Sequence, residues 1–227
     1  MFVRSVTVSA NLPKNLKVCH KPANKNIYRR YFERLPLHHD CRQSSLHQRT
    51  TDNLENPDAL HNFAPPKRKD MDKIKNPYLP LRDKGYNCFA CSPWNDKGLK
   101  MEFWEDGDDI VSVWTASKDY QSWTETLHGG IQATLLDEVG GWYVTRKLQT
   151  AGVTSTLNIR YRKTVPVGEP LEIRVRLKEM RRNLAVMEGS ISCGGQTCTT
   201  AEITYFTVPQ ERAREEFFFS GCELEKD

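Results

Sequence analysis

The residues most suited to chemistry lie in one short run, His128–Glu138, which reads His-Gly-Gly-Ile-Gln-Ala-Thr-Leu-Leu-Asp-Glu. It holds the only histidine after residue 61, followed by Gly129 and Gly130. Glycines let backbone N–H groups approach a ligand closely, and a helix start carries partial positive charge. About two and a half turns later the same helix would carry Asp137 and Glu138. Backbone amides that can bind an oxygen, together with an acid or base further along the same helix, favour acyl chemistry.

The motif has an ordinary structural interpretation as well. A His-Gly-Gly sequence occurs by chance, and an aspartate within a helix is often a solvated residue or a local hydrogen bonder. The motif alone therefore leaves both interpretations open, and the surrounding elements must decide between them.

A helix over about residues 130–147 is predicted to position these groups. Its small or polar residues Gly130, Thr134, Asp137 and Gly141 share one stripe, where a ligand or a partner helix could come close. The opposite stripe is apolar and recurs at helical spacing: Ile131, Leu135, Leu136, Val139, Trp142 and Tyr143. Trp142 is interpreted as a core residue and not as part of an acyl pocket.

Strands are predicted on both sides of this helix. Apolar and polar residues alternate from Leu99 to Trp104, Asp106–Asp109 is a hairpin turn signal, and a second strand ends near Lys118. The later strands and a short closing helix are expected at 153–163, 169–180, 184–194, 197–208 and 209–217. This order predicts an α+β fold in which an antiparallel sheet wraps around one long central helix.

The charge and tryptophan content divide the chain near residue 70. Residues 1–70 hold 13 Lys/Arg and 6 Asp/Glu, whereas residues 71–227 hold 20 and 23 and contain all five tryptophans. The first segment is predicted to be a disordered extension, and Met71 to be the true start, with a real tail or a basic transit peptide as alternatives. The folded domain is expected at 71–227. Its charge gives no indication of nucleic acid binding.

Cysteine usage and hydropathy bear on location. The seven cysteines are odd in number without regular spacing, and neither a secretory signal nor a membrane-length apolar stretch is visible. Reduced thiols and a cytoplasmic location are therefore expected, with no membrane association. An organellar matrix is the alternative if residues 1–70 are a transit peptide.

Three groups of residues together resemble the PaaI-like acyl-CoA thioesterases of the hotdog fold, within the thioesterase superfamily. The resemblance covers about residues 85–208. The residues that carry it are Cys88-Phe89-Ala90-Cys91 with Gly98-Leu99, Leu127-His128-Gly129-Gly130 with Asp137, and Thr154-Ser155-Thr156-Leu157-Asn158-Ile159-Arg160-Tyr161.

The resemblance implies catalytic roles for four residues. Asp137 would attack the thioester or activate water, and the two roles stay open. The backbone N–H of Gly129 would polarise the thioester carbonyl, and His128 would help to place the sulfur side of the substrate. Thr154 would orient the water or the carboxylate from the neighbouring subunit.

The same resemblance implies a substrate-binding set around these residues. Several relatives carry an amide side chain where this chain has Ser122, with Gln121 beside it, so the leaving-group contact departs from the family pattern. Glu138 is the competing carboxylate and fits a structural role better. The complete predicted set is Gln121, Ser122, Gly130, Thr134, Glu138, Ser155, Arg160, Arg162, Arg181 and Arg182.

The arginines and cysteines carry weaker signals. Arg160 and Arg162 alternate on one strand, and Arg181 and Arg182 lie near a turn, where guanidinium groups could meet the phosphates of CoA. Solvated strand faces show the same pattern. Cys88-x-x-Cys91 invites a zinc interpretation, but its possible second pair, Cys193 and Cys198, is loosely spaced, so no metal is predicted.

The expected function is hydrolysis of an acyl-CoA to free acid and CoA, without a metal or organic cofactor and with a role in lipid metabolism. The site would form between subunits, which implies a homodimer at least and allows a tetramer. The alternatives are an enoyl-thioester hydratase or dehydratase of the same fold, and a non-catalytic acyl-CoA or acyl-carrier binding protein.

Overall fold

The computed structural model describes residues 71–225. The predictions made for residues 1–70, a disordered extension and an upstream segment before the true start, lie outside the described residues.

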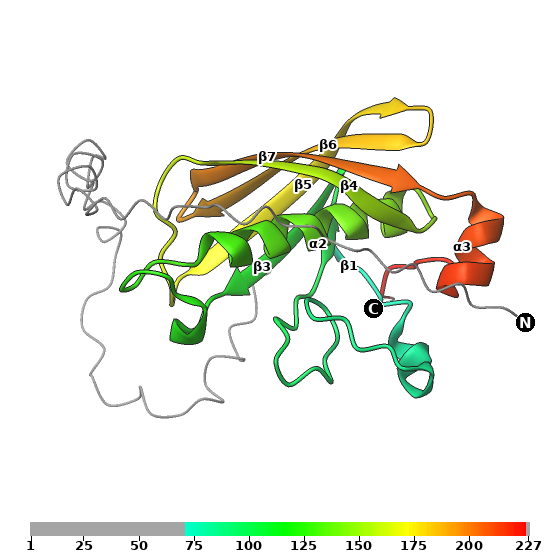
Figure 1. The fold of residues 1–227 in the computed structure, drawn as a ribbon, viewed down its shortest axis with the longest axis horizontal. Coiled ribbons are helices and arrows are strands. Elements are labelled where there is room, and N and C mark those ends of the chain that lie inside the picture. The colour runs from blue at the N-terminus through cyan, green and yellow to red at the C-terminus, as the bar shows by residue number, and fades with distance from the viewer. Residues whose placement is uncertain (1–70, 226–227) are drawn as a thin grey trace, which may run out of the picture. The chain divides into compact units, whose positions relative to one another are not determined.

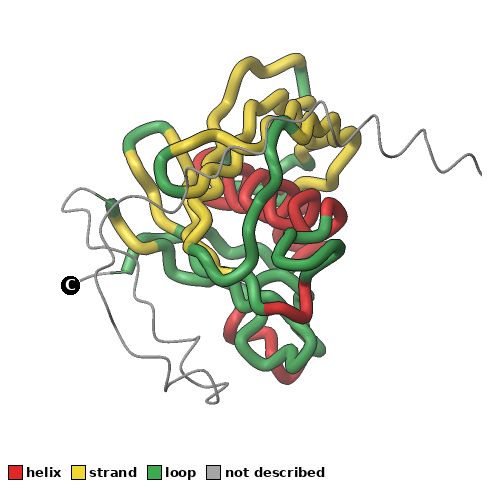
Figure 2. The backbone as a smooth tube through the Cα atoms, turned by 90° about the vertical axis from the view of Figure 1, so that its left-hand side faces the viewer, coloured by secondary structure: helices red, strands yellow, loops and turns green. Residues whose placement is uncertain are grey.

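The described residues form one antiparallel sheet of seven strands in the order β1-β2-β3-β5-β6-β7-β4. One long helix, α2 (Gly129–Lys147), packs against β3, β4, β5, β6 and β7. Figure 1 shows α2 lying along one side of the sheet, and Figure 2 shows the strands curving around it. The remaining elements are β1 (Asp72–Lys73), β2 (Trp104–Asp106), β3 (Asp109–Thr115), β4 (Gly152–Tyr161), β5 (Pro170–Arg181), β6 (Leu184–Cys193), β7 (Gln196–Thr207), α3 (Gln210–Phe217) and the 3-10 helices η3 (Leu79–Lys84) and η4 (Lys118–Tyr120).

The core lies between α2 and the sheet. Leu135, Leu136 and Val139 on the helix are fully buried, and each such side chain contributes about 1.5–3 kcal/mol by leaving water. Gly189 in β6 permits the close packing, since a Cβ there would lie 3.0 Å from Leu136 Cδ2. Trp142 is buried and stacks on Phe103 with ring centroids 4.3 Å apart, so its prediction as a core residue is confirmed.

The central helix, the hairpin turn and the four later strands are confirmed, with ends shifted by a few residues. The strand predicted over Leu99–Trp104 is wrong, because only Trp104 belongs to a strand, β2. Leu99, Met101 and Phe103 are buried as the alternation predicted. However, Lys100 has φ +53°, a left-handed backbone conformation that a regular strand does not contain.

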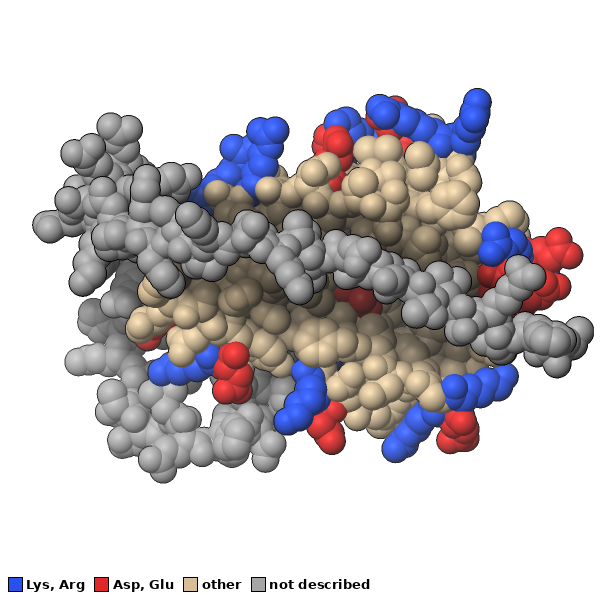
Figure 3. All heavy atoms as spheres, in the orientation of Figure 1, with Lys and Arg blue, Asp and Glu red and all other residues tan. Residues whose placement is uncertain are grey.

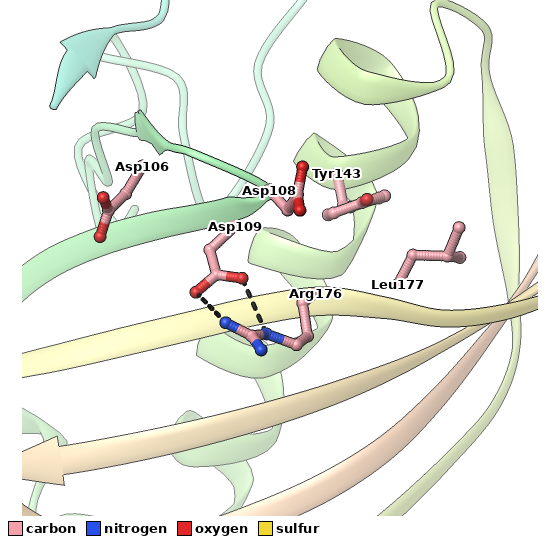
Figure 4. Close-up of a pocket in the computed structure, with 6 residues that line it drawn as sticks. All are labelled: Asp106, Asp108, Asp109, Tyr143, Arg176 and Leu177. Atoms are coloured by element: carbon pink, nitrogen blue, oxygen red, sulfur yellow. Dashed lines mark hydrogen bonds and ion pairs between the residues drawn. The ribbon is translucent and has the colours of Figure 1, made fainter.

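Ion pairs of the buried Asp109 carboxylate tie β3 to β5 beside a cavity. The Asp109 carboxylate accepts hydrogen bonds from Arg176 Nε at 2.9 Å and from Arg174 Nη1 at 2.6 Å. Figure 4 shows Asp109 and Arg176 facing each other, and none of the predicted site residues lines this cavity. Burial alone would raise the pKa of Asp109, but the two guanidinium groups outweigh it and hold the pKa below its usual range.

Replacing this carboxylate is expected to remove an acid-sensitive contribution to stability. A group whose pKa is depressed on folding stabilises the fold above its unfolded pKa, and this stabilisation is lost as pH falls through the folded value. We expect Asp109→Asn to lower the free energy of unfolding by about 2 kcal/mol near pH 7, with the difference shrinking below about pH 4. Chemical denaturation across this pH range measures it. Glu216→Gln, in an exposed pair with Arg212, is the control that should change little. A constant difference at every pH would contradict the assignment.

Candidate active site

Asp137 lies on α2 where the helix faces β4 and β7. Its Oδ1 accepts a hydrogen bond from Thr154 Oγ1 at 2.7 Å and lies 2.9 Å from the hydroxyl of Tyr205. Its Oδ2 has no hydrogen-bond partner within residues 71–225. One carboxylate oxygen is thus held by two hydroxyls, while the other is left to accept a proton or attack a carbon.

Tyr205 is a site residue that the sequence did not reveal. Its hydroxyl also contacts the backbone oxygen of Asp137 at 2.6 Å, which fixes the helix turn as well as the side chain. Burial raises the pKa of Tyr205 far above its ordinary value, so the phenol stays protonated and donates. Within the strand pattern nothing distinguishes this tyrosine from a core residue. The small residues Gly140 and Gly141 on α2 make room for it, because a Cβ at these positions would lie 3.1 and 3.2 Å from the Tyr205 side chain.

His128 caps the N-terminus of α2. Its Nδ1 accepts from the N–H of Gly130 at 2.9 Å, and its carbonyl accepts from the N–H groups of Ile131 and Gln132. Because Nδ1 accepts this hydrogen bond, the ring N–H is assigned to Nε2. The backbone N–H of Gly129 has no acceptor in the described part of the chain. A single free amide at a helix start is suited to binding a negatively charged oxygen.

The start of α2 is fixed in place from inside the protein. The side chain of Gln132, which is buried, donates to the backbone oxygen of Leu127 and accepts from Thr199 Oγ1 at 2.6 Å. Tyr161 Oη on β4 donates to the backbone oxygen of Gly129 at 3.0 Å. These contacts hold the free amide in one position, which an oxyanion donor requires.

Removing the histidine cap should weaken the helix start. We expect His128→Ala to lower the free energy of unfolding by about 1 kcal/mol, because the Gly130 N–H loses its acceptor. Chemical denaturation measures the change. His128→Asn should recover most of the loss, since asparagine is a good N-cap residue. Equal stability of the alanine and asparagine variants would contradict the cap.

The free amide and the carboxylate lie far apart within one chain. Eight residues of helix separate Gly129 from Asp137, a distance of about 12 Å at 1.5 Å per residue. Thr154 contacts Asp137 of its own chain, and its role toward the neighbouring subunit stays a prediction. The structure thus gathers Asp137 and Thr154 at one position, and His128, Gly129 and Gly130 at another.

The other predicted substrate-binding residues are spread over both positions. Gln121 and Ser122 precede His128 and bond within their own loop: Gln121 Oε1 accepts from the N–H of Glu125, and Ser122 N–H donates to the carbonyl of Thr126. Thr134 bonds back to the carbonyl of Gly130. Ser155 lies exposed at a bulge next to Thr154.

The four arginines lie at opposite ends of the sheet. Arg160 is on β4, and Arg162, which follows this strand, donates to Thr200 Oγ1 at 3.3 Å. Arg181 and Arg182 lie at the β5–β6 turn, where Arg181 pairs with Glu179. In one chain the two pairs do not meet.

Glu138 points away from Asp137 toward the segment that precedes β2. Its Oε1 accepts from Trp142 Nε1 at 3.0 Å, and the Cys88 Sγ lies 3.6 Å from the same oxygen. Burial raises the pKa of Glu138 above its ordinary value. These contacts fit the structural interpretation of Glu138 and offer nothing to the group around Asp137.

A sequence match covers both positions of the candidate site. Residues 124–200 match the model of the thioesterase superfamily. The matched region makes up about a third of the chain. It begins just before the His128 cap and extends into β7. No curated protein matches the chain.

Several solved structures are similar to parts of this chain. The thioesterase superfamily protein RHA08564 is 20% identical over 82% of this chain and 81% of its own, with a TM-score of 0.50. A hypothetical thioesterase from Streptococcus pneumoniae TIGR4, solved with coenzyme A, is 26% identical over 45% and 83%, with a TM-score of 0.43. Zebra fish thioesterase superfamily member 2 is 23% identical over 51% and 88%, with a TM-score of 0.45. The predicted hotdog fold is confirmed.

The structure also bears on membrane association. Among the described residues, no helix has the length and apolar character needed to cross a bilayer.

Proposed function

We propose that the domain over residues 71–227 is an acyl-CoA thioesterase that hydrolyses its substrate to free acid and CoA. The observation that carries the proposal is the state of Asp137, whose Oδ1 is held by Thr154 and Tyr205 while its Oδ2 is open. The free N–H of Gly129 supplies the second requirement, a donor for the carbonyl oxygen. The superfamily match over residues 124–200 supports thioester chemistry.

The site is composite in this proposal. A carbonyl group that binds the Gly129 amide through its oxygen must also have its carbon within about 3.5 Å of the attacking oxygen. A separation of about 12 Å along α2 forbids this within one chain. Asp137 of one subunit therefore acts with Gly129 of its partner, and a homodimer is the minimal active unit.

Strand β4 offers the surface for this dimer. It is an edge strand of ten residues, and Val153 and Tyr161 at its two ends are about half exposed. A long exposed edge readily pairs with another chain. On the face seen in Figure 3, charged side chains gather mainly toward the rim, and the visible surface between them is largely uncharged. Pairing of β4 with its own copy would extend the sheet across a two-fold axis.

The contacts of β4 predict the register of this pairing. Thr154 contacts Asp137 and Tyr161 contacts Gly129, so the two ends of the strand mark the two halves of the site. Ser155 is an extra residue at the bulge. An antiparallel pairing centred on Asn158 then sets Thr154 opposite Tyr161 of the partner, and Asp137 next to the partner's helix start.

A cysteine at the centre of this register should cross-link the dimer. Asn158 is exposed and would lie directly opposite its own copy, at a Cα separation of about 5 Å that suits a disulfide. We expect Asn158→Cys to form an intersubunit disulfide on mild oxidation, read by non-reducing electrophoresis. Arg160→Cys is the control, because pairing would place its two copies about 13 Å apart. Cross-linking of the control alone would contradict the register.

The reaction has two routes that share these groups. As a base, Asp137 takes a proton from water through Oδ2, and the water oxygen attacks the carbonyl carbon. As a nucleophile, Asp137 forms a mixed anhydride that water then cleaves. In both routes the partner's Gly129 N–H stabilises the oxyanion, the C–S bond breaks, and the thiolate of CoA leaves and is protonated. The arginines would bind the phosphates, Arg181 and Arg182 from one subunit with Arg160 and Arg162 from the other.

The experiment that tests this function is thiol release from a panel of acyl-CoAs, aromatic and aliphatic, from short to long chains. The full-length protein should release CoA from at least one of them without added metal or cofactor, and the preferred chain reports the pocket size. Binding of acyl-CoA without turnover would favour the non-catalytic alternative. Addition of water to an enoyl-CoA, with the thioester intact, would favour a hydratase.

A further inference from the structure

The segment before β2 and the helix α2 bring two thiols and a carboxylate together. Within residues 71–225, Cys88, Cys91 and Glu138 are the one group of three potential ligands whose Sγ and carboxylate atoms lie within 4.8 Å of one another. Cys91 is buried and Cys88 is partly buried. Cys88 and Glu138 are 50 residues apart in the sequence, so no local motif could identify Glu138 as the third potential ligand.

The distance between Cys88 and Glu138 matches that between two ligands of a tetrahedral metal site. Bonds of about 2.3 Å to sulfur and 2.1 Å to oxygen, at a tetrahedral angle, place the sulfur about 3.6 Å from the oxygen. The Cys88 Sγ lies 3.6 and 3.8 Å from the two carboxylate oxygens of Glu138. The backbone N–H of Cys91 also donates to Cys88 Sγ at 3.4 Å, a contact that stabilises sulfur as a thiolate.

The carboxylate lacks a positive partner. No Lys, Arg or His of the described chain forms an ion pair with Glu138, which accepts hydrogen bonds from Trp142 and Cys88. A carboxylate that is partly withdrawn from water without a cation is costly, and a divalent metal would supply the missing charge. Two sulfurs with one carboxylate suit zinc better than calcium or magnesium, which prefer oxygen ligands throughout.

We propose that Cys88, Cys91 and Glu138 bind one Zn²⁺. The fourth position would hold water or the hydroxyl of Tyr86, which lies 3.0 Å from Cys91 Sγ. Binding displaces the two thiol protons to solvent. The metal would join the Cys88–Cys91 turn to α2 at the residue next to Asp137, and so fix the helix turn that carries the proposed catalytic carboxylate. From the sequence no zinc site was predicted, because a second closely spaced cysteine pair is absent. In the proposed site Glu138 supplies the third ligand instead.

Metal content of the full-length protein tests the site independently of activity. We expect about one zinc per chain by elemental analysis after dialysis, and replacement by Co²⁺ should give the near-ultraviolet absorption of cobalt–thiolate bonds. The variant Cys88→Ser/Cys91→Ser should lose both signals although it keeps five of the seven cysteines. Glu138→Gln should bind zinc about tenfold more weakly or worse in competition with a chelator. Cys193→Ala, outside the cluster, should bind as the native protein does.

Two results would overturn the proposal. One is a native protein that takes up neither zinc nor cobalt with thiolate absorption. The other is a double serine variant that binds metal like the native chain, which would assign the metal to other cysteines. If the double variant fails to fold by circular dichroism, the cobalt spectrum of the native protein and the affinity of the near-isosteric Glu138→Gln variant decide the question.

Discussion

Asp137→Asn is expected to lower kcat for acyl-CoA hydrolysis by about 10²–10⁴-fold, the usual loss when a general base is removed. The substitution keeps the shape of the side chain and an oxygen that Thr154 and Tyr205 can still bond. It removes the negative charge and the open Oδ2 on which both routes depend. KM should change much less than kcat, because the group acts on the transition state. Thiol release under saturating substrate measures the loss.

The hydroxyls around Asp137 provide a graded comparison. Thr154→Val and Tyr205→Phe each remove one hydrogen bond to the carboxylate but leave its charge. Each should lower kcat by about tenfold, because this factor corresponds to the free energy of one hydrogen bond to a charged group. An Asp137→Asn variant that kept kcat within a few-fold of the native protein, with its fold intact, would contradict the catalytic assignment.

Gly129→Pro is the second substitution with a large expected effect. Proline removes the backbone N–H that we assign to the oxyanion and should lower kcat by about 10²–10³-fold. The fold should tolerate it, since proline is favoured at the first position of a helix. His128 has φ −61° and ψ 135°, the extended conformation that a residue before proline prefers.

Gly129→Ala is the matched control for this substitution. It adds a Cβ, which would lie 3.4 Å from the ring of Tyr161, but keeps the N–H group. Its kcat should stay within a few-fold of the native value. Similar losses in the proline and alanine variants would show that crowding against Tyr161 matters and not the amide, and would contradict the role of Gly129.

Local sequence patterns predicted the parts of the site that depend on neighbours in the chain. The helical stripe placed Asp137 on the side of α2 that faces Tyr205, and the glycines after His128 marked a helix start. The hairpin turn at Gly107 also followed from residue types alone, with φ +56°. In each case the determining interactions lie within one or two turns of the chain.

Contacts between distant segments were beyond such patterns. Tyr205 is separated from Asp137 by 68 residues, and its strand pattern is that of an ordinary core strand. The strand predicted from Leu99 is wrong because Lys100 has a left-handed backbone conformation. This conformation cannot be recognised from the sequence, since Leu99, Met101 and Phe103 are still buried in alternation. The thiol of Cys88 contacts a carboxylate on the helix, Glu138, which is 50 residues away in the sequence.

The central claim is that Asp137 of one subunit acts with Gly129 of the other, and a heterodimer of two inactive chains tests it most directly. Asp137→Asn and Gly129→Pro chains, co-expressed with different affinity tags, give a heterodimer with one site intact and one site doubly altered. Purified through both tags, it should release CoA at about half the native rate, while each variant homodimer stays nearly inactive. A heterodimer as inactive as the two homodimers would contradict the composite site.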